Sequence, residues 1–233
     1  MNKDVAWLQE WLNSKGANLK VDGVGGSMTR AAFIALFANK DAKAITQAEL
    51  DQIAKDLGDT SAKRIQAVAK VESAGSGWFD SGLPKILYER HKFYKHTKGR
   101  FGTTYYSNRL PGGYTMDADH NGINDSWEKL ATAVCLDPKA ALMSVSIGKF
   151  QVLGEYYAFC GYEHPIEMLW AARNSEYAHY TMLRDFILKV ANIKPQFLRL
   201  STNPSDNIPF VSRYNGPAYA KNNYHVKIAQ AMR

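Results

Sequence analysis

Apolar and polar positions follow the period of a helix over most of the chain. The clearest case is a stretch in which Ile65, Val68 and Ala69 lie at i, i+3 and i+4, the spacing of one apolar face. The next position on that face is Glu72, where an aliphatic side chain would be expected. A glycine-rich stretch follows, so we expect the helix to end near Ser73. The pattern thus places a carboxyl on an apolar face at a helix C-terminus, where desolvation and the helix dipole both raise its pKa.

The pattern then changes to the two-residue period of a strand. In residues 84–91, Ile86, Tyr88 and Arg90 alternate with Leu87, Glu89 and His91, which predicts a strand over that range. The strand brings a second carboxylate, Glu89, beside a cation that would keep it ionised. One neutral acid and one charged carboxylate is the division of roles in glycoside hydrolysis. The alternative is that Glu72 is a solvated glutamate at a helix end and that Glu89 belongs to an ion pair on the surface.

Helical patterns also occupy both ends of the chain. Asn2 or Asp4 can cap a first helix that ends at Gly16, and Ser27 can cap the next one. Thr46 and Glu49 form a capping box for a third. Further along, the pattern predicts helices that start at Asp137-Pro138, cover roughly residues 166–173, run from Ser175 toward Pro195, and close the chain. Residues 201–209 are predicted to form a loop.

An acidic stretch at residues 117–128 matches the twelve-residue pattern of a calcium-binding loop. A glycine lies at its sixth position, and the oxygen ligands would be Asp117, Asp119, Asn121, Asp125 and Glu128. Asn124 departs from the pattern because a hydrophobic residue normally anchors the loop there, and the chain holds no second such loop. The sequence therefore leaves two interpretations, a structural calcium site or a polar turn that caps a helix at Ser126.

Composition sets the limits of these interpretations. The 233 residues are 45% hydrophobic, which suffices for one large domain or for a medium and a small one. The longest apolar run, Ala31 to Ala38, is too short to span a bilayer, and the N-terminus lacks the apolar region of a signal peptide. We therefore expect the protein to be made in the cytoplasm. Cys135 and Cys160 lie in no metal-ligand spacing, and we expect both to be reduced.

The net charge of +7 is concentrated at the C-terminal end. Residues 184–233 hold eight Lys and Arg against two Asp and Glu. Such a region suits an anionic partner, for example an anionic outer-membrane surface. A nucleic-acid partner would explain the charge and nothing else, so we do not expect one.

The N-terminal residues carry a motif. Residues 5–37 resemble the small three-helix peptidoglycan-binding domain of many cell-wall hydrolases. The matching residues are Leu8, Gln9, Leu12, Gly16, Val21, Asp22, Gly23, Gly26, Thr29 and Ala32. The resemblance implies a wall-binding domain over residues 1–42, with Asp22, Gly23 and Thr29 in its motif. The alternative is a helical hairpin that only supports the neighbouring domain.

Residues 46–233 resemble the N-acetylmuramidase domain of phage endolysins, whose motifs are related to those of goose-type lysozyme and lytic transglycosylases. Four blocks carry the match in one order: VESAGSGWF (71–79), PKILYERH (84–91), SIGKFQVLG (146–154) and RYNGP (213–217). The resemblance implies a mainly α chain, with a lysozyme-like helical domain and a small β-sheet (α+β) over residues 43–233. It makes Glu72 the catalytic acid and Glu89 the second carboxylate. It places Ser76, Gln151, Tyr214 and Asn215 near the sugar.

The activity implied is that of an endolysin. It would hydrolyse the β-1,4 bond between N-acetylmuramic acid and N-acetylglucosamine in peptidoglycan and so lyse the host, as a monomer with no cofactor required for catalysis. Glu72 would protonate the leaving oxygen, while Glu89 would either orient a water or stabilise the oxocarbenium-like transition state. A separate pore-forming protein would release the enzyme from the cytoplasm to the wall.

Three other classes of protein fit the sequence less well. A lytic transglycosylase shares the blocks, but it needs no water-activating base, so Glu89 favours a hydrolase. A zinc amidase is disfavoured because the six histidines form no H-E-x-x-H motif. A non-enzymatic wall-binding protein would leave Glu72 on its apolar face unexplained.

Overall fold

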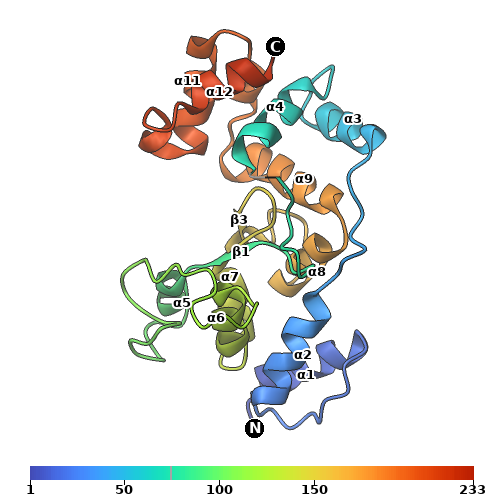
Figure 1. Cartoon of the computed structure of the whole chain (residues 1–233), viewed down its shortest axis with the longest axis vertical. Helices are drawn as coiled ribbons and strands as arrows, with labels where there is room; N and C mark the ends of the chain where they lie inside the picture. Colours follow the sequence, from blue (N-terminus) through green and yellow to red (C-terminus); the bar gives the residue numbers. More distant parts are fainter. Residues whose placement is uncertain (74) are drawn as a thin grey trace.

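The computed structural model describes residues 1–73 and 75–233, with residue 218 described by its backbone only. Helices dominate it, and one small sheet lies near the middle of the molecule (Figure 1). The helices of the first half are α1 (Lys3–Ser14), α2 (Ser27–Phe37), α3 (Gln47–Asp56), α4 (Lys63–Glu72), α5 (Arg90–His96) and α6 (Asp125–Val134). Those of the second half are α7 (Pro138–Met143), η1 (Gly154–Tyr156), α8 (Pro165–Asn174), α9 (Glu176–Asp185), η2 (Phe186–Val190), α10 (Lys194–Phe197), α11 (Pro204–Tyr214), η3 (Gly216–Tyr219) and α12 (Tyr224–Ala231).

The sheet has three antiparallel strands in the order β1 (Ile86–Tyr88), β2 (Val145–Ile147), β3 (Val152–Leu153). Ile86 pairs with Ile147, and Tyr88 with Val145. These four residues are buried, whereas Leu87 and Ser146 between them are partly exposed. One face of the sheet therefore joins the core, which follows from the two-residue period of a strand. The mainly α fold with a small sheet confirms the prediction from the sequence.

Several helix ends lie where the sequence predicts them. The Asn2 side chain caps α1, Thr46 and Glu49 form the capping box of α3, and the Asp137 side chain caps α7 ahead of Pro138. Helix α4 ends at Glu72. Ser27 is the first residue of α2 rather than its cap, which is Gly26.

Two predictions of local structure were wrong. The strand predicted over residues 84–91 covers only Ile86–Tyr88, because the Glu89 carbonyl accepts hydrogen bonds from the N–H groups of Lys92 and Phe93 and thereby starts α5. The loop predicted over residues 201–209 is largely helix, since Asn203 caps α11 and a proline at its first position is compatible with a helix start.

The N-terminal unit contains two helices within residues 1–42, where the resemblance implies three. A turn occupies the stretch between them. Gln9 on α1 organises this turn: its Oε1 accepts hydrogen bonds from the N–H groups of Asp22 (3.1 Å) and Gly23 (2.9 Å), and its Nε2 donates to Asp22 Oδ1 (3.0 Å) and Thr29 Oγ1 (3.3 Å). Gly23 has φ +68°, and a Cβ there would lie 2.6 Å from the Asn2 carbonyl oxygen, so the turn requires glycine.

This N-terminal unit shares its core with the rest of the chain. The rings of Phe33 and Phe37 lie 6.0 and 5.6 Å from that of Trp127 on α6, and the Trp11 ring meets Trp170 on α8 edge-on at 5.4 Å. All of Phe33, Phe37 and Trp127 are fully buried. The packing of α1 and α2 is therefore continuous with the larger part of the molecule.

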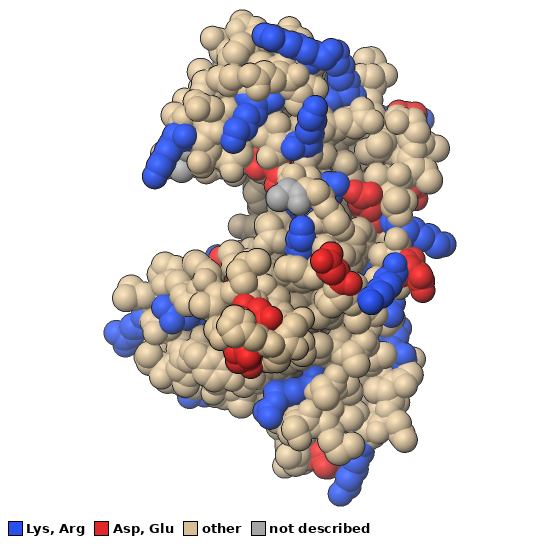
Figure 2. All heavy atoms as spheres, in the orientation of Figure 1, with Lys and Arg blue, Asp and Glu red and all other residues tan. Residues whose placement is uncertain are grey.

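A deep hollow divides the opposite side of the molecule. Figure 2 shows it between the part that contains α4, α11 and α12 and the part that contains α5 and α6. Glu72 belongs to the first part and Glu89 to the second. Across the portion of the chain that the structure describes, no helix has the length and apolarity needed to cross a membrane.

Candidate active site

Glu72 lies at the C-terminal end of α4, half-buried against the C-terminal helices. Its Oε2 accepts a hydrogen bond from Asn215 Nδ2 at 2.8 Å. Its Oε1 is buried and has no hydrogen-bond partner among the described residues. Burial raises the pKa of the Glu72 carboxyl, and the Asn215 amide and the Lys227 ammonium offset that rise only in part. The surroundings of Glu72 therefore favour its protonated form more than water does, and Asn215 holds one of its two oxygens in place.

The wall beside Glu72 comes from the last helices of the chain. Tyr214 is the last residue of α11 and packs between Phe210 (5.4 Å, stacked) and Phe186 (5.6 Å, edge-on). Burial, with a further effect of the nearby Glu72 charge, raises the pKa of Tyr214 and of Tyr224 on α12. Both phenols therefore remain neutral neighbours of Glu72. The structure thus brings Glu72 together with Tyr214 and Asn215, which follow it by more than 140 positions in the sequence.

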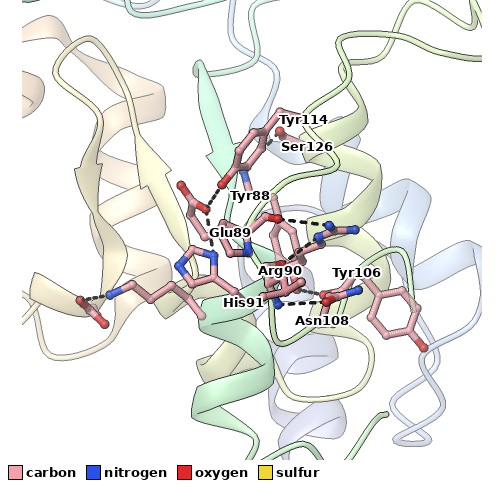
Figure 3. A network of polar contacts seen from close by, with 12 residues as sticks. Tyr88, Glu89, Arg90, His91, Tyr106, Asn108, Tyr114 and Ser126 are labelled. Atoms are coloured by element: carbon pink, nitrogen blue, oxygen red, sulfur yellow. Dashed lines mark hydrogen bonds and ion pairs between the residues drawn. The ribbon is translucent and has the colours of Figure 1, made fainter. Parts of the chain in front are cut away.

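Glu89 occupies a different environment, at the junction of β1 and α5. Its Oε2 accepts a 2.5 Å hydrogen bond from the Tyr114 hydroxyl and lies 3.3 Å from His91 Nδ1. In Figure 3 the carboxylate lies between the phenol and the imidazole. The side chain is 16% exposed. The Arg90 guanidinium does not contact Glu89 and donates instead to the carbonyls of Leu110 and Pro111, each at 3.2 Å.

The loop that carries Tyr114 is fixed by two cations. Arg90 holds its carbonyls, as above, and Lys129 Nζ on α6 donates to the Gly113 carbonyl at 2.5 Å. The backbone also bends at Gly112 and Gly113, both with positive φ. The Tyr114 ring remains 49% exposed although its hydroxyl is engaged. The loop therefore presents an aromatic face next to the second carboxylate.

His179 on α9 links the segments that follow Glu72 and precede Gln151. Its Nδ1 accepts a hydrogen bond from Lys149 N at 2.9 Å, and its Nε2 lies 2.8 Å from the Ala172 carbonyl, to which it must donate. Its ring lies 4.6 Å from that of Trp78. Burial lowers the pKa of His179 to about 4, so the ring is neutral at ordinary pH. A Cβ at Gly77 would lie 2.3 Å from this ring, which explains why the Glu72 loop needs a glycine there.

Gln151 and Ser76 both engage their own turns. Gln151 Nε2 donates to the Gly148 carbonyl at 2.7 Å, with the backbone of Gln151 at φ +52°. Ser76 Oγ accepts from Trp78 N at 3.1 Å, and the residue is exposed. Both side chains therefore stabilise the turns around the site, and Ser76 acts as the turn former that the sequence allows.

The acidic loop brings three of its five predicted ligands together. One carboxylate oxygen each from Asp117, Asp119 and Asp125 lies within 4.8 Å of the others. Asn121 Nδ2 donates to Asp119 Oδ2 (2.9 Å) and to Glu128 Oε1 (2.7 Å). Hydrogen bonds from the Thr115 hydroxyl and the Ala118 N–H lower the pKa of Asp125. Asn124, rather than Ser126, caps α6.

Local sequence patterns connect neither Tyr114 with Glu89 nor His179 with the site. The contact of Tyr114 with Glu89 spans 25 positions. His179 belongs to no motif, and its signal is a pair of glycines, Gly77 and Gly148, whose missing side chains leave room for a ring. Neither relation follows from local periodicity.

Comparisons with known proteins identify the family of the chain. A family model described as Muramidase: N-acetylmuramidase matches residues 61–233. Among solved structures, the crystal structure of the Burkholderia AP3 phage endolysin is similar, with a TM-score of 0.70 and 30% sequence identity over 98% of this chain and 94% of that one. A search of curated proteins found no match.

These matches extend over most of the chain and include the segments that carry Glu72, Glu89, Gln151, Tyr214 and Asn215. They confirm the prediction of a glycoside hydrolase over that of a transglycosylase or a purely wall-binding protein. The chain therefore belongs to the N-acetylmuramidase family, and it is a peptidoglycan hydrolase with the fold of a phage endolysin.

Proposed function

We propose that Glu72 is the general acid that protonates the glycosidic oxygen when the β-1,4 bond from N-acetylmuramic acid to N-acetylglucosamine is cleaved. The observation that carries the proposal is that the two carboxyl oxygens of Glu72 have different surroundings. Asn215 fixes Oε2, while Oε1 is buried and unpartnered among the described residues. A carboxyl whose pKa is raised by burial holds its proton more strongly than a free glutamate and can transfer it to a leaving group.

Glu89 is the second carboxylate in this proposal. The hydrogen bond from Tyr114 occupies its Oε2 and leaves Oε1 to orient a water or to stabilise the oxocarbenium-like transition state. The two roles differ in outcome, because an oriented water attacks the opposite face of the sugar and inverts the anomeric centre. Proton NMR of the first-formed sugar anomer distinguishes them, since inversion of a β-bond yields the α-anomer. Tyr214 forms the wall at Glu72, and Gln151 and Ser76 act by shaping the turns around the sugar.

Mass spectrometry of the fragments released from purified peptidoglycan tests the activity. Hydrolysis between the two sugars leaves N-acetylmuramic acid at the reducing end with the mass of one added water. The Glu72→Gln variant is the matched inactive control. Anhydro ends would identify a transglycosylase, and fragments cleaved in the peptide would identify an amidase or peptidase, and either would overturn the proposal.

Residues 1–42 act in this proposal as a wall-binding unit attached to a catalytic unit of residues 43–233. Gln9, Asp22, Gly23 and Thr29 support it indirectly, because their hydrogen bonds shape a turn on which Val24 is exposed (63%), and Met28 is exposed (72%) at the start of α2. Exposed apolar side chains at a turn and the helix start that follows it suit contact with a ligand. Substituting both with Asp should weaken co-sedimentation with insoluble peptidoglycan. Unchanged co-sedimentation would leave the unit a structural support for α6 and α8.

The acidic loop is proposed to hold one calcium ion, ligated by Asp117, Asp119, Asn121, Asp125 and Glu128. The clustering of three carboxylates supports it, because such oxygens repel one another unless a cation is present. Millimolar calcium should then raise the melting temperature, magnesium should do so less, and Asp117→Ala should abolish the difference. A melting temperature indifferent to calcium and to chelator would make the loop a polar turn.

The last part of the proposal concerns where the protein acts and how it reaches the cell wall. In this proposal the chain acts as a monomer on the host wall after a separate pore-forming protein has released it. The basic side chains seen over α11 and α12 in Figure 2 provide contact with an anionic outer-membrane surface. Expression without a pore-forming partner should leave host cells intact. Lysis of such cells would contradict this part of the proposal.

A further inference from the structure

A cavity of about 950 Å³ lies beside the end of α4, between α3, α4, α9 and residues 39–44. Its volume is that of an ordinary small-ligand site. Neither Glu72 nor Glu89 lines it, whereas Ser76 does. The buried Tyr180 gives it an apolar floor, and Trp78 and Phe79 from the loop after Glu72 also line it.

The cavity and the catalytic acid lie on neighbouring sides of one helix end. Ala69, Lys70 and Ser73 line the cavity, whereas Glu72 is directed to Asn215 on the other side. Successive residues of a helix turn by about 100°, and a helix with its side chains is about 10–12 Å across. Because Ser73 follows Glu72 by about 100°, a chain attached to a sugar at Glu72 reaches the cavity after passing around roughly a third of the helix.

Some of the charged side chains that line the cavity form an ion pair, and others do not. Lys149 and Glu176 form an ion pair at 2.7 Å, with each side chain 15% exposed. Lys40 and Lys70 are exposed and make no ion pair with any residue that the structure describes, and the same holds for Asp80. The cavity thus presents two available cations, one available anion and an apolar floor. A ligand of matching chemistry is a short peptide with carboxylates and one free amine.

We propose that this cavity binds the stem peptide that peptidoglycan carries on its muramic acid. Such a peptide has an acidic residue, a terminal carboxylate and a diamino acid. Its carboxylates lie at Lys40 and Lys70 and its amine at Asp80. Four extended residues span roughly 13 Å at about 3.3 Å each, which matches the path around α4. The inference rests on the proposed cleavage at Glu72, and it makes the enzyme specific for peptide-bearing glycan.

Two substrates test the proposal, namely purified glycan strands that carry stem peptides and the same strands after an amidase has removed the peptides. The measured quantity is the ratio of kcat/KM on the first substrate to kcat/KM on the second. Charge reversal in the double variant Lys40→Glu, Lys70→Glu should lower this ratio about tenfold, as expected when two exposed ion pairs are lost and replaced by repulsion. The matched control is Lys63→Glu, which makes the same charge change at the exposed start of α4, outside the cavity. The control should keep the wild-type ratio.

A ratio unchanged in the double variant, or one lowered equally by Lys63→Glu, would overturn the proposal. Hydrolysis of the peptide-free strands by the wild type reports the proposed chemistry at Glu72 by itself, so a failure there is distinguished from a failure of peptide binding. If charge reversal perturbs folding, the neutral double variant Lys40→Ala, Lys70→Ala takes its place in the test. This neutral variant should also lower the ratio, but by less than charge reversal.

Discussion

Glu72 and Glu89 are both partly buried glutamates, and the difference between their neighbours is the basis of the different roles proposed for them. Glu72 ends a helix among aromatic rings and receives one amide hydrogen bond, with its other oxygen buried and unpartnered in the described structure. Glu89 begins a helix between a phenol and an imidazole, which hold its carboxylate in place. Burial raises the pKa of Glu72, as the proposed role of acid requires. The comparison teaches that the neighbours of a glutamate, more than the residue type, decide what it can do.

The largest expected effect comes from removing the acid on one side of this comparison. Glu72→Gln preserves the shape and the Asn215 contact, so hydrolysis should fall by about 10² to 10⁴, the usual contribution of general acid catalysis. Reducing ends released from peptidoglycan measure it. The melting temperature at neutral pH should not fall, because the substitution removes a carboxyl that burial disfavours as an anion. Near-normal activity would end the assignment of Glu72.

A substitution at His179 should change how the stability of the protein depends on pH. Burial holds its pKa at about 4 against an ordinary 6.5, so its contribution to stability is present above about pH 6.5 and is lost as the pH falls toward 4. The loss amounts to about 3 kcal/mol at about 1.4 kcal/mol for each pH unit. Melting curves between pH 7 and pH 4.5 measure it. His179→Gln should flatten the decline, whereas substitution of the exposed His120 by Asn should not. Equal slopes in all three proteins would show that His179 is not the responsible group.

A smaller change sharpens the role of Glu89. Tyr114→Phe removes the hydroxyl and keeps the ring, so kcat should fall about five- to tenfold with little change in KM, the effect of one hydrogen bond. The exposed Tyr105, whose hydroxyl lies 3.1 Å from Thr132, provides the control variant Tyr105→Phe. If Tyr114→Ala lowers activity and Tyr114→Phe does not, the ring matters and the hydrogen bond does not.

The smallest expected effect is a displacement of the pH profile. The Lys227 charge lowers the pKa of Glu72, so Lys227→Met should raise that pKa. Activity needs the protonated acid and is lost as the pH rises through its pKa, so the alkaline limb should move upward. Lys221→Met is a control on the same exposed surface. A limb that moves downward would contradict the electrostatic account.

Local sequence predicts the position of Glu72 better than it predicts the residues that surround Glu72. The apolar spacing of Ile65, Val68 and Ala69 is enough to place Glu72 at a helix end, since that pattern depends on neighbours within two turns. The Asn215 contact, by contrast, spans 143 positions and was anticipated only through resemblance to a family. The calcium-like loop matches its pattern in sequence, yet the pattern alone does not establish an ion.

The remaining differences have physical causes too. Alternation carried the predicted strand past Tyr88, but hydrogen bonds to the Glu89 carbonyl start a helix there. Pro204 and Pro209 suggested a loop, yet Pro204 lies at the first helical position, where its missing N–H costs nothing. The packing of Phe33 and Phe37 on Trp127 joins segments about 90 positions apart, and no local pattern contains that information.

The most direct test of the account is the ionisation of Glu72 itself. Carbon-13 NMR of the side-chain carboxyls, titrated from pH 3 to pH 8, gives the pKa of Glu72 from the resonance that is missing in Glu72→Gln. The account predicts a pKa above 4.5, the ordinary value, because desolvation at the end of α4 outweighs Asn215 and Lys227. A Glu72 pKa at or below 4.5 would mean that the carboxyl is ionised near neutral pH, and it would contradict the assignment of Glu72 as the acid.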